Sequence, residues 1–265
     1  MKKITLSALA ALTIALSITS CKKGEEDPGF TILSRKARVT GEWKVTSLET
    51  ASERTSINYY NGNIARTPYT TTRSVTHDGA TYSSTYVSPN SVTNTNETST
   101  GTGSVAAHTY TFKKDATWES NYSYTETVVT PYANFTQTTK TTFSQIESGV
   151  WDFTSGVGKE NKSKESILVS VTSSKTVRLV VIDITAGSNT TSQSDTYTDE
   201  YTYAANEKSF VWNLVMLKNK EIKAEASFEN TYKGDVSSVN SGGTPFLNVN
   251  TSVEETGSNK IVLTR

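Results

Sequence analysis

The chain has 265 residues, of which 34% are hydrophobic, and its 26 basic and 26 acidic residues give a formal net charge of zero. This balance gives no support for nucleic acid as a partner, because nucleic-acid-binding domains carry a basic excess. The chain contains one cysteine, so a disulfide within the chain is excluded.

The first twenty residues have the three parts of a secretory signal peptide. Lys2 and Lys3 supply the positive start, residues 4–18 form an apolar segment, and Thr19 and Ser20 form a small-residue exit. The apolar segment is shorter than the about 20 residues that a membrane-spanning helix needs. We therefore predict that residues 1–20 are a signal peptide that is removed.

The cysteine lies directly after this segment, in the quartet Ile18-Thr19-Ser20-Cys21. The quartet resembles a bacterial lipobox, which the lipoprotein signal peptidase cleaves just before the cysteine. The resemblance implies that Cys21 becomes the mature N-terminus and carries a diacylglyceryl thioether and an amide-linked acyl chain. Each buried methylene contributes about 0.8 kcal/mol, so several chains anchor a protein firmly. The membrane is therefore an expected partner, through acyl chains on Cys21.

Residues 21–32 form a charged segment that reads "KKGEEDPG" after the cysteine and predicts a solvated tether. The acidic cluster of Glu25, Glu26 and Asp27 resembles the export signal that sends some lipoproteins to the outer face of the outer membrane. The resemblance implies an outer-membrane, lipid-anchored and surface-exposed protein. An anchor that faces the periplasm is the alternative.

Residues 33–265 are rich in Thr, Ser, Tyr and Val and show apolar residues in alternation rather than at helical spacing. The low hydrophobic content suits a sheet that buries one face, because alternate residues then face water. This length could hold one all-β domain or two, and no internal linker divides it.

Alternation and turn residues place the strands along this domain. In the first strand Trp43, Val45 and Ser47 share one side, and residues 108–126 form a hairpin that turns at 113–116. Further strands are predicted at residues 150–153, 166–172, 176–185, 197–203, 210–217, 221–228 and 260–264. Tight turns are predicted at Asn-Gly 61–62 and Asp-Gly 78–79, with weaker turn signals at 173–174 and 218–219. Such a meander closes into a barrel or folds into a sandwich.

Half of the residues between positions 67 and 100 are Ser or Thr, and the larger side chains there are a few Tyr and Val. Threonine favours strands, but a segment with so little to bury could also be a mobile loop. We predict a long, poorly packed hairpin that turns at Asp78-Gly79.

Gly41-Glu42-Trp43 opens the first strand after a short basic stretch and resembles the G-x-W signature of lipocalins. The later segments "YTFKKDATW", "ESGVWDF", "FVWNLVMLKNKEIKAEA" and "NKIVLTR" are similar in order and spacing to the lipocalin-like domains of bacterial lipoproteins. The resemblance implies an all-β fold, an antiparallel meander that closes into a lipocalin-like β-barrel over residues 33–265. The Ser/Thr-rich segment would be a long insertion into that barrel.

Closure of the barrel implies that the first and last strands pair antiparallel. Ile261, Leu263 and Arg265 share one side of the last strand, which brings Arg265 near Trp43. Lipocalins place an arginine across the tryptophan of G-x-W, and Arg265 is the matching candidate in this chain.

Residue patterns typical of catalysis were not found in the sequence. His77 and His108 lie in polar, turn-rich surroundings without the companion residues of a zinc motif, and Gly156-Val157-Gly158-Lys159 lacks the spacing of a phosphate loop. Adjacent acidic residues such as Asp199 and Glu200 point to opposite faces of a strand. We therefore predict a binding protein, with no catalytic residue, cofactor or metal, and not an enzyme.

Tyrosine and phenylalanine gather in two parts of the domain, Tyr122, Tyr124, Tyr132 and Phe135 in one and Tyr197, Tyr201 and Tyr203 in the other. Such rows could stack on sugars, line an apolar cavity or simply pack across strands. The first hypothesis is a barrel that binds a small apolar or glycan-like ligand. The alternative is a structural or adhesive surface protein with a filled barrel core that acts through its loops. Large aromatic side chains at the barrel centre would favour the alternative, and an open cavity would favour the first.

Overall fold

A computed structural model describes residues 34–60, 64–65, 68–89, 95–155, 165–239 and 245–265. The described chain is nearly all β, as predicted. Its elements are α2 (Arg35–Val39), β1 (Gly41–Tyr60), β2 (Ile64–Ala65), β3 (Tyr69–His77), β4 (Thr81–Pro89), β5 (Asn96–Phe112), β6 (Thr117–Pro131), β7 (Thr136–Ser155), β8 (Glu165–Ala186), β9 (Asn189–Thr202), β10 (Lys208–Leu217), β11 (Glu221–Val239) and β12 (Pro245–Thr264).

The strands form one antiparallel sheet that closes on itself. Near α2 the ring runs β1-β5-β6-β7-β8-β10-β11-β12 and returns to β1, because β5 pairs with β1 and β10 pairs with β8. Farther from α2 the β3–β4 hairpin inserts between β1 and β5. There β9 pairs with the edge of β8 that faces away from β7. The predicted antiparallel barrel with a Ser/Thr-rich insertion is therefore confirmed.

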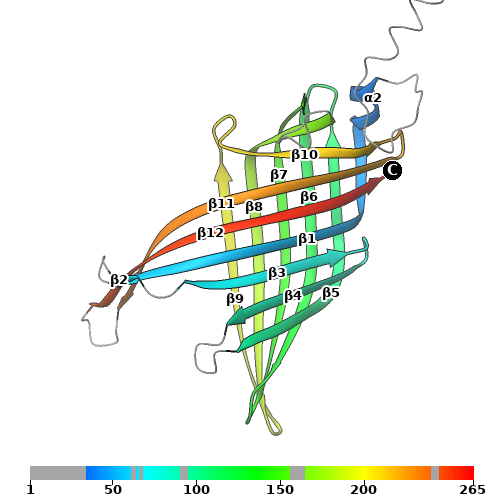
Figure 1. The fold of residues 1–265 in the computed structure, drawn as a ribbon. Coiled ribbons are helices and arrows are strands. Elements are labelled where there is room, and N and C mark those ends of the chain that lie inside the picture. The colour runs from blue at the N-terminus through cyan, green and yellow to red at the C-terminus, as the bar shows by residue number, and fades with distance from the viewer. Residues whose placement is uncertain (1–33, 61–63, 66–67, 90–94, 156–164, 240–244) are drawn as a thin grey trace, which may run out of the picture.

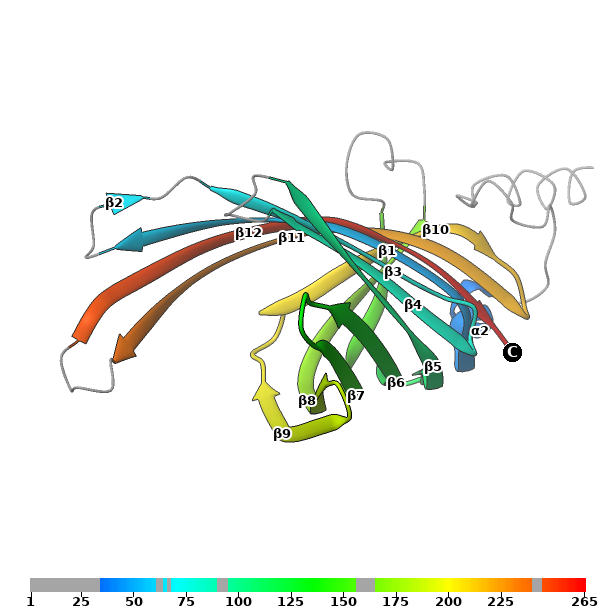
Figure 2. The same ribbon diagram turned by 90° about the horizontal axis from the view of Figure 1, so that it is seen from below.

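The barrel is closed near α2 and opens away from it. In Figure 1, β6, β7, β8 and β9 run steeply while β11, β12, β1 and β3 cross in front of them. Figure 2 shows that the two groups of strands diverge, with β9 at the edge of one group and β11 and β12 extending in the other. We call the part near α2 the closed end, and residues 172–202 of β8 and β9 the arm.

The closed end is filled by large apolar side chains. Its core contains four tryptophans together with Phe112, Ile167 and Leu263, all buried: Trp43, Trp118, Trp151 and Trp212. Three of the indole N–H groups donate to backbone carbonyls: Trp43 Nε1 to Val39 at 2.7 Å, Trp118 Nε1 to Ser170 at 3.1 Å and Trp151 Nε1 to Lys113 at 3.3 Å. Aromatic rings therefore occupy the centre of the closed end.

Helix α2 lies beside the closed end and is fixed to it from several sides. The Ser34 hydroxyl caps the helix by accepting from the Ala37 amide at 3.1 Å. Val39 is buried in the core, and its carbonyl accepts from Trp43 Nε1 at 2.7 Å. Arg35 forms an ion pair of 2.9 Å with the buried Glu165 of β8.

The first and last strands pair as predicted, with Lys44 opposite Thr264 and Val45 opposite Leu263. A bulge between Val45 and Ser47 then shifts the register by one residue. Leu48 packs against the core as a result, and the prediction that Ser47 shares a side with Trp43 and Val45 is wrong.

The prediction of a turn at Ser173-Ser174 is also wrong. β8 continues through these residues without interruption and pairs with β7 along its length. A β-bulge opposite Ser148 and Gly149 leaves Thr172 as an extra residue in β8. Ser173 and Ser174 therefore lie beside an irregularity in the strand pairing and not at a chain reversal.

Three predicted turns are confirmed, at residues 113–116, at 218–219 and at Asp78-Gly79. At the last of these Gly79 has a φ of +87°, and Asp78 Oδ1 accepts from the Thr81 amide at 2.7 Å. The Ser/Thr-rich segment thus forms the predicted hairpin of β3 and β4. The predicted turn at Asn61-Gly62 lies outside the described residues.

Candidate functional site

The inner face of β5–β9 carries side chains in cross-strand rows, because each of these strands pairs with the next in register. The row nearest the closed end, which we call the Glu147 row, contains Tyr110, Ser120, Glu147, Ser174 and Tyr201. The next, the His108 row, contains His108, Tyr122, Gln145, Thr176 and Asp199. The third, the Tyr124 row, contains Tyr124, Phe143, Arg178 and Tyr197.

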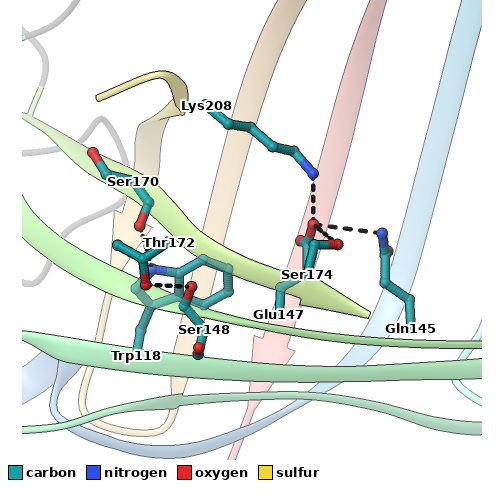
Figure 3. Close-up of polar contacts among 8 residues, drawn as sticks. All are labelled: Trp118, Gln145, Glu147, Ser148, Ser170, Thr172, Ser174 and Lys208. Atoms are coloured by element: carbon teal, nitrogen blue, oxygen red, sulfur yellow. Dashed lines mark hydrogen bonds and ion pairs between the residues drawn. The ribbon is translucent and has the colours of Figure 1, made fainter. Parts of the chain in front are cut away.

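Glu147 is the centre of a polar network at the transition from the closed end to the arm (Figure 3). Its Oε1 atom accepts from Lys208 Nζ at 2.7 Å, from the Ser174 hydroxyl at 3.1 Å and more weakly from Gln145 Nε2 at 3.4 Å. The Glu147 side chain is 13% exposed, and Lys208 neutralises it. All three donors reach the same oxygen, and within the described part of the chain Oε2 accepts no hydrogen bond.

An accessible aromatic surface continues from this network onto the arm. Lys208 Nζ lies 5.2 Å from the centroid of the Tyr203 ring, a cation–π contact. The Tyr203 ring lies 6.1 Å from that of Tyr201 with an interplanar angle of 26°. Tyr203 packs against the core, whereas Tyr201 is 53% exposed.

Tyr197 and Arg178 extend the same surface farther along the arm. The Arg178 guanidinium lies 4.8 Å from the centroid of the Tyr197 ring. Both residues are exposed, and both lie on the same side of the sheet as Glu147.

A histidine pair lies deeper, where the β3–β4 hairpin meets the barrel. His77 Nε2 and His108 Nδ1 are 2.8 Å apart, and both residues are buried. The Gly79 amide donates to His77 Nδ1 at 3.1 Å, so in the neutral ring His77 Nε2 carries the proton and donates to His108. The sequence placed both histidines in polar, turn-rich surroundings and gave no sign of this buried contact, which depends on the pairing of β3, β4 and β5.

Burial controls the protonation of this pair. It lowers the pKa of His77 and, together with the neighbouring His77, lowers the pKa of His108 to about 3. Burial also raises the pKa of Tyr122, which stacks on His108, and of Tyr110, whose ring lies tilted beside it. The pair is therefore neutral at physiological pH. Among the described residues no three His, Cys, Asp or Glu side chains come together as a metal site would need.

Tyr82, Tyr124 and Phe143 form a stacked group that joins the insertion hairpin to the barrel. The Tyr82 and Tyr124 rings are 4.2 Å apart and nearly parallel, and Phe143 lies 5.0 Å from Tyr124. Beside them Glu126 reaches across β5 to accept a hydrogen bond from the Ser84 hydroxyl. Gly101 makes this possible, since a Cβ at that position would lie 2.2 Å from Glu126 Oε1.

The structure brings together the two residues that the sequence singled out for barrel closure. Arg265 Cζ lies 4.1 Å from the centroid of the buried Trp43 ring, and Arg265 Nη2 donates to the Arg38 carbonyl at 2.9 Å. Gly41 leaves room for this arginine: it has a φ of +136°, and a Cβ there would lie 3.0 Å from Arg265 Nη2. Cys21 lies outside the described residues.

The predicted aromatic groups divide in the structure. Tyr122 and Tyr124 join the inner rows, whereas Tyr132 and Phe135 stack on each other at 4.4 Å in the β6–β7 turn. Asp199 faces inward with the His108 row, and Glu200 pairs with Lys175 on the opposite face, as expected for adjacent strand residues.

Glu147 and Lys208 were not predicted as site residues from the sequence. Alternation along "TTFSQIES" could have placed Gln145 and Glu147 on the side of Phe143. Contact with Lys208 depends on the β8–β10 pairing, which joins residues far apart in the chain.

Comparison with solved structures finds weak similarity to two bacterial proteins. One is the P. putida toluene transporter TodX, with 4% identity over 85% of this chain and 90% of that chain and a TM-score of 0.17. The other is a Pseudomonas aeruginosa FadL homologue, with 8% identity over 86% of this chain and 91% of that chain and a TM-score of 0.18. Similarity at this level carries no argument about function. No family model and no curated protein matches the chain.

The candidate functional site is therefore the patch of the inner surface that runs from Gln145 and Glu147 through Lys208 to Tyr201 and Tyr203. It combines accessible aromatic rings, a charge-neutralised carboxylate with one oxygen open, and an ammonium group. These groups can hold a polar ligand by hydrogen bonds and ring contacts.

Proposed function

We propose that this chain is a lipid-anchored cell-envelope protein that binds a ligand on the inner face where β7 and β10 meet its arm, and that it acts as a binding protein rather than an enzyme. The observation that carries this proposal is the contrast between a filled closed end and an accessible inner face beyond it. Trp43, Trp118 and Trp212 are buried at the closed end, whereas Tyr197 and Tyr201 on the arm are exposed.

This contrast bears on the two hypotheses drawn from the sequence. Large aromatic side chains fill the barrel centre, which favours the filled-core alternative over a small apolar ligand enclosed in the barrel. Two of the exposed tyrosine rings, Tyr197 and Tyr201, lie on the inner face of β9, next to the Glu147 network, whereas Tyr132 lies in the β6–β7 turn, away from it. The proposal therefore keeps the filled core and moves ligand contact to the arm.

Membrane attachment through acyl chains on Cys21 is supported by the resemblance of Ile18-Thr19-Ser20-Cys21 to a lipobox. No described helix has the length and apolarity to cross a membrane. The acidic cluster after Cys21 supports display at the outer surface of the outer membrane.

The lipocalin-like assignment remains part of the proposal. It is supported by the eight strands that close the ring near α2 and by the arginine stacked on the tryptophan of G-x-W. Hairpin β3–β4 and strand β9 would then be additions to a lipocalin-like barrel.

Native mass spectrometry of the full chain, purified in mild detergent from the cells that make it, tests the binding function. We expect a co-purified small molecule or oligomer whose added mass is lost when Glu147 and Tyr201 are both replaced by alanine. A chain with no added mass, and no binding from envelope extracts, would contradict the proposal.

The anchor is tested separately with Cys21→Ala. Because this change removes the thiol that carries the diacylglyceryl group, the variant should not incorporate labelled palmitate and should leave the membrane fraction. A variant that stays labelled and membrane-bound would show that Cys21 is not the lipid attachment site.

A further inference from the structure

We infer that the surface formed by Gln145, Glu147, Tyr201, Tyr203 and Lys208, the Glu147 platform, binds a neutral oligosaccharide chain. This inference rests on the proposed binding function and names its ligand class. Three features of the platform carry it: balanced charge, unused hydrogen-bonding atoms and spaced aromatic rings.

Charges on and around the platform occur in opposite pairs. Lys208 neutralises Glu147 at 2.7 Å, and Arg178 lies one row from Asp199 on the same inner face. An anionic ligand would meet the carboxylates, and a cationic ligand would compete with the cations already in place. A neutral ligand with many hydroxyl groups is neither repelled by the carboxylates nor forced to displace Lys208 or Arg178 from its partner.

The platform offers hydrogen-bonding atoms of both kinds at its centre. Glu147 Oε2 accepts no hydrogen bond from the described residues, and the Gln145 amide donates through nitrogen, which leaves its oxygen as an acceptor. Lys208 has three N–H donors, one of which goes to Glu147. A hydroxyl group both donates and accepts, so neighbouring sugar hydroxyls can donate to the carboxylate and accept from the ammonium.

Aromatic rings flank this polar centre. The exposed Tyr201 ring and the Tyr203 ring lie within 26° of each other, so both can turn a face toward one ligand. A sugar ring has an apolar C–H face that packs on such rings while its hydroxyls stay in contact with polar groups.

The second exposed ring favours a chain over a single sugar as the ligand. Tyr197 lies on the same side of β9 as Tyr201, four residues away, and strand geometry places the two Cα atoms about 13 Å apart. This distance is longer than one sugar ring. An oligomer that runs along the arm can contact both tyrosines, and the Arg178 guanidinium beside Tyr197 adds donors along its path.

Titration calorimetry of the full chain against defined probes tests the inference. The probes are cellohexaose and maltohexaose as neutral chains, hexagalacturonate as a charged chain, palmitate as an apolar ligand and neutral polysaccharide extracted from the producing cells. We expect at least one neutral probe to bind and the charged and apolar probes not to bind. Binding of the extracted polysaccharide alone would indicate a ligand from the cell's own envelope.

Two variants locate the site, each with a matched control. Glu147→Gln keeps the shape and removes the charge, and Tyr201→Ala removes an exposed ring, so each should weaken binding of the neutral chain about tenfold or more. Glu200→Gln removes a carboxylate on the opposite face of β9, and Tyr132→Ala removes an exposed ring in the β6–β7 turn. Both controls should bind like the unchanged chain.

The outcomes separate this inference from the function on which it rests. Binding of hexagalacturonate alone would show that the saccharide is charged rather than neutral, and binding of palmitate alone would overturn the saccharide class. Either result would contradict the inference and leave a binding protein. Binding of a neutral chain that is unaffected by Glu147→Gln and Tyr201→Ala would overturn the site. If none of the neutral probes binds, the inference is wrong, and the co-purification experiment decides separately whether the chain binds a ligand of another class.

Discussion

The two halves of β8 are both rich in apolar residues, but the first half is buried and the second is partly exposed. Residues 165–171 read ESILVSV and are almost entirely buried, whereas residues 177–184 read VRLVVIDI and leave Leu179 and Ile184 exposed by 37% and 40%. The first half pairs with β7 and β10 inside the closed ring, and the second half pairs with β7 and β9 on the arm. Apolar composition alone therefore does not bury a strand, since burial requires other strands that face it across the closed barrel.

This difference assigns stability to one region of the molecule and ligand contact to another. The closed end supplies the packed core from which most folding free energy comes. The arm, whose strand β9 is exposed along its whole length, supplies accessible surface. Changes at the closed end should alter stability, and changes on the arm should alter binding.

Trp43→Ala at the closed end should produce the largest loss. Trp43 is fully buried, and removing a buried tryptophan costs about 3 to 5 kcal/mol. We expect a severe drop in the melting temperature, measured by circular dichroism. Tyr132→Ala, which removes an exposed ring in a turn, serves as the control, and an equal loss from both variants would contradict the division into two regions.

Mild acid should destabilise the protein through the histidine pair. The pKa of His77 and that of His108 are both lower in the folded state than the value of about 6.5 in the unfolded chain, so the unfolded chain binds protons first as the pH falls. Stability is thus complete above about pH 7 and decreases toward about pH 5, before carboxylates such as Asp78, with a pKa of about 2, begin to titrate.

Urea unfolding at several pH values measures this effect. The double variant His77→Phe and His108→Phe replaces both hydrogen-bonding partners by apolar rings, so its stability should vary much less across the same range. An unchanged pH dependence in the double variant would show that the pair is not responsible.

Arg265→Ala should have a smaller effect than Trp43→Ala. The guanidinium stacked on the Trp43 indole contributes about 0.5 to 2 kcal/mol, and its hydrogen bond to the Arg38 carbonyl is lost as well. A modest decrease in melting temperature is expected, with partial recovery in Arg265→Lys, which keeps the charge. A loss as large as that of Trp43→Ala would mean that the arginine, rather than the buried indole, holds the barrel closed.

Tyr201→Ala should leave stability nearly unchanged. The side chain is 53% exposed, and substitutions at exposed positions usually change the free energy of unfolding by less than about 0.5 kcal/mol. A clear loss of stability in urea unfolding would show that the arm is part of the core.

The sequence was sufficient to predict the β class, the first and last strands as partners, and three of the turns. The β class and the turns depend on local signals, namely alternation along the strands and turn residues such as Asp78 and Gly79. The pairing of the first and last strands followed from the barrel closure that the lipocalin resemblance implies, and alternation around Trp43 and Leu263 agreed with it. Two β-bulges were not predicted. One turns Ser47 to the face opposite Trp43 and Val45, and the other lets β8 continue past Ser173. A bulge depends on the partner strand and leaves no reliable local pattern.

The candidate site was largely hidden for the same reason. Tyr201 and Tyr203 were noted as aromatic residues, but Glu147 and Lys208 meet through a pairing between β8 and β10 that no local pattern predicts. His77 and His108 came together through the insertion hairpin, whose position beside β5 depends on the whole sheet.

Hydrogen exchange measured by mass spectrometry, on the free chain and with a neutral hexasaccharide that binds, tests the division between the regions most directly. We expect slow exchange of the closed-end amides of residues 166–171 and 210–214, and much faster exchange in β9. Added ligand should slow exchange around Gln145 to Glu147 and along residues 197–208. Equal protection of β9 and the closed end in the free chain, or ligand protection confined to residues outside these two segments, would contradict the division and the site.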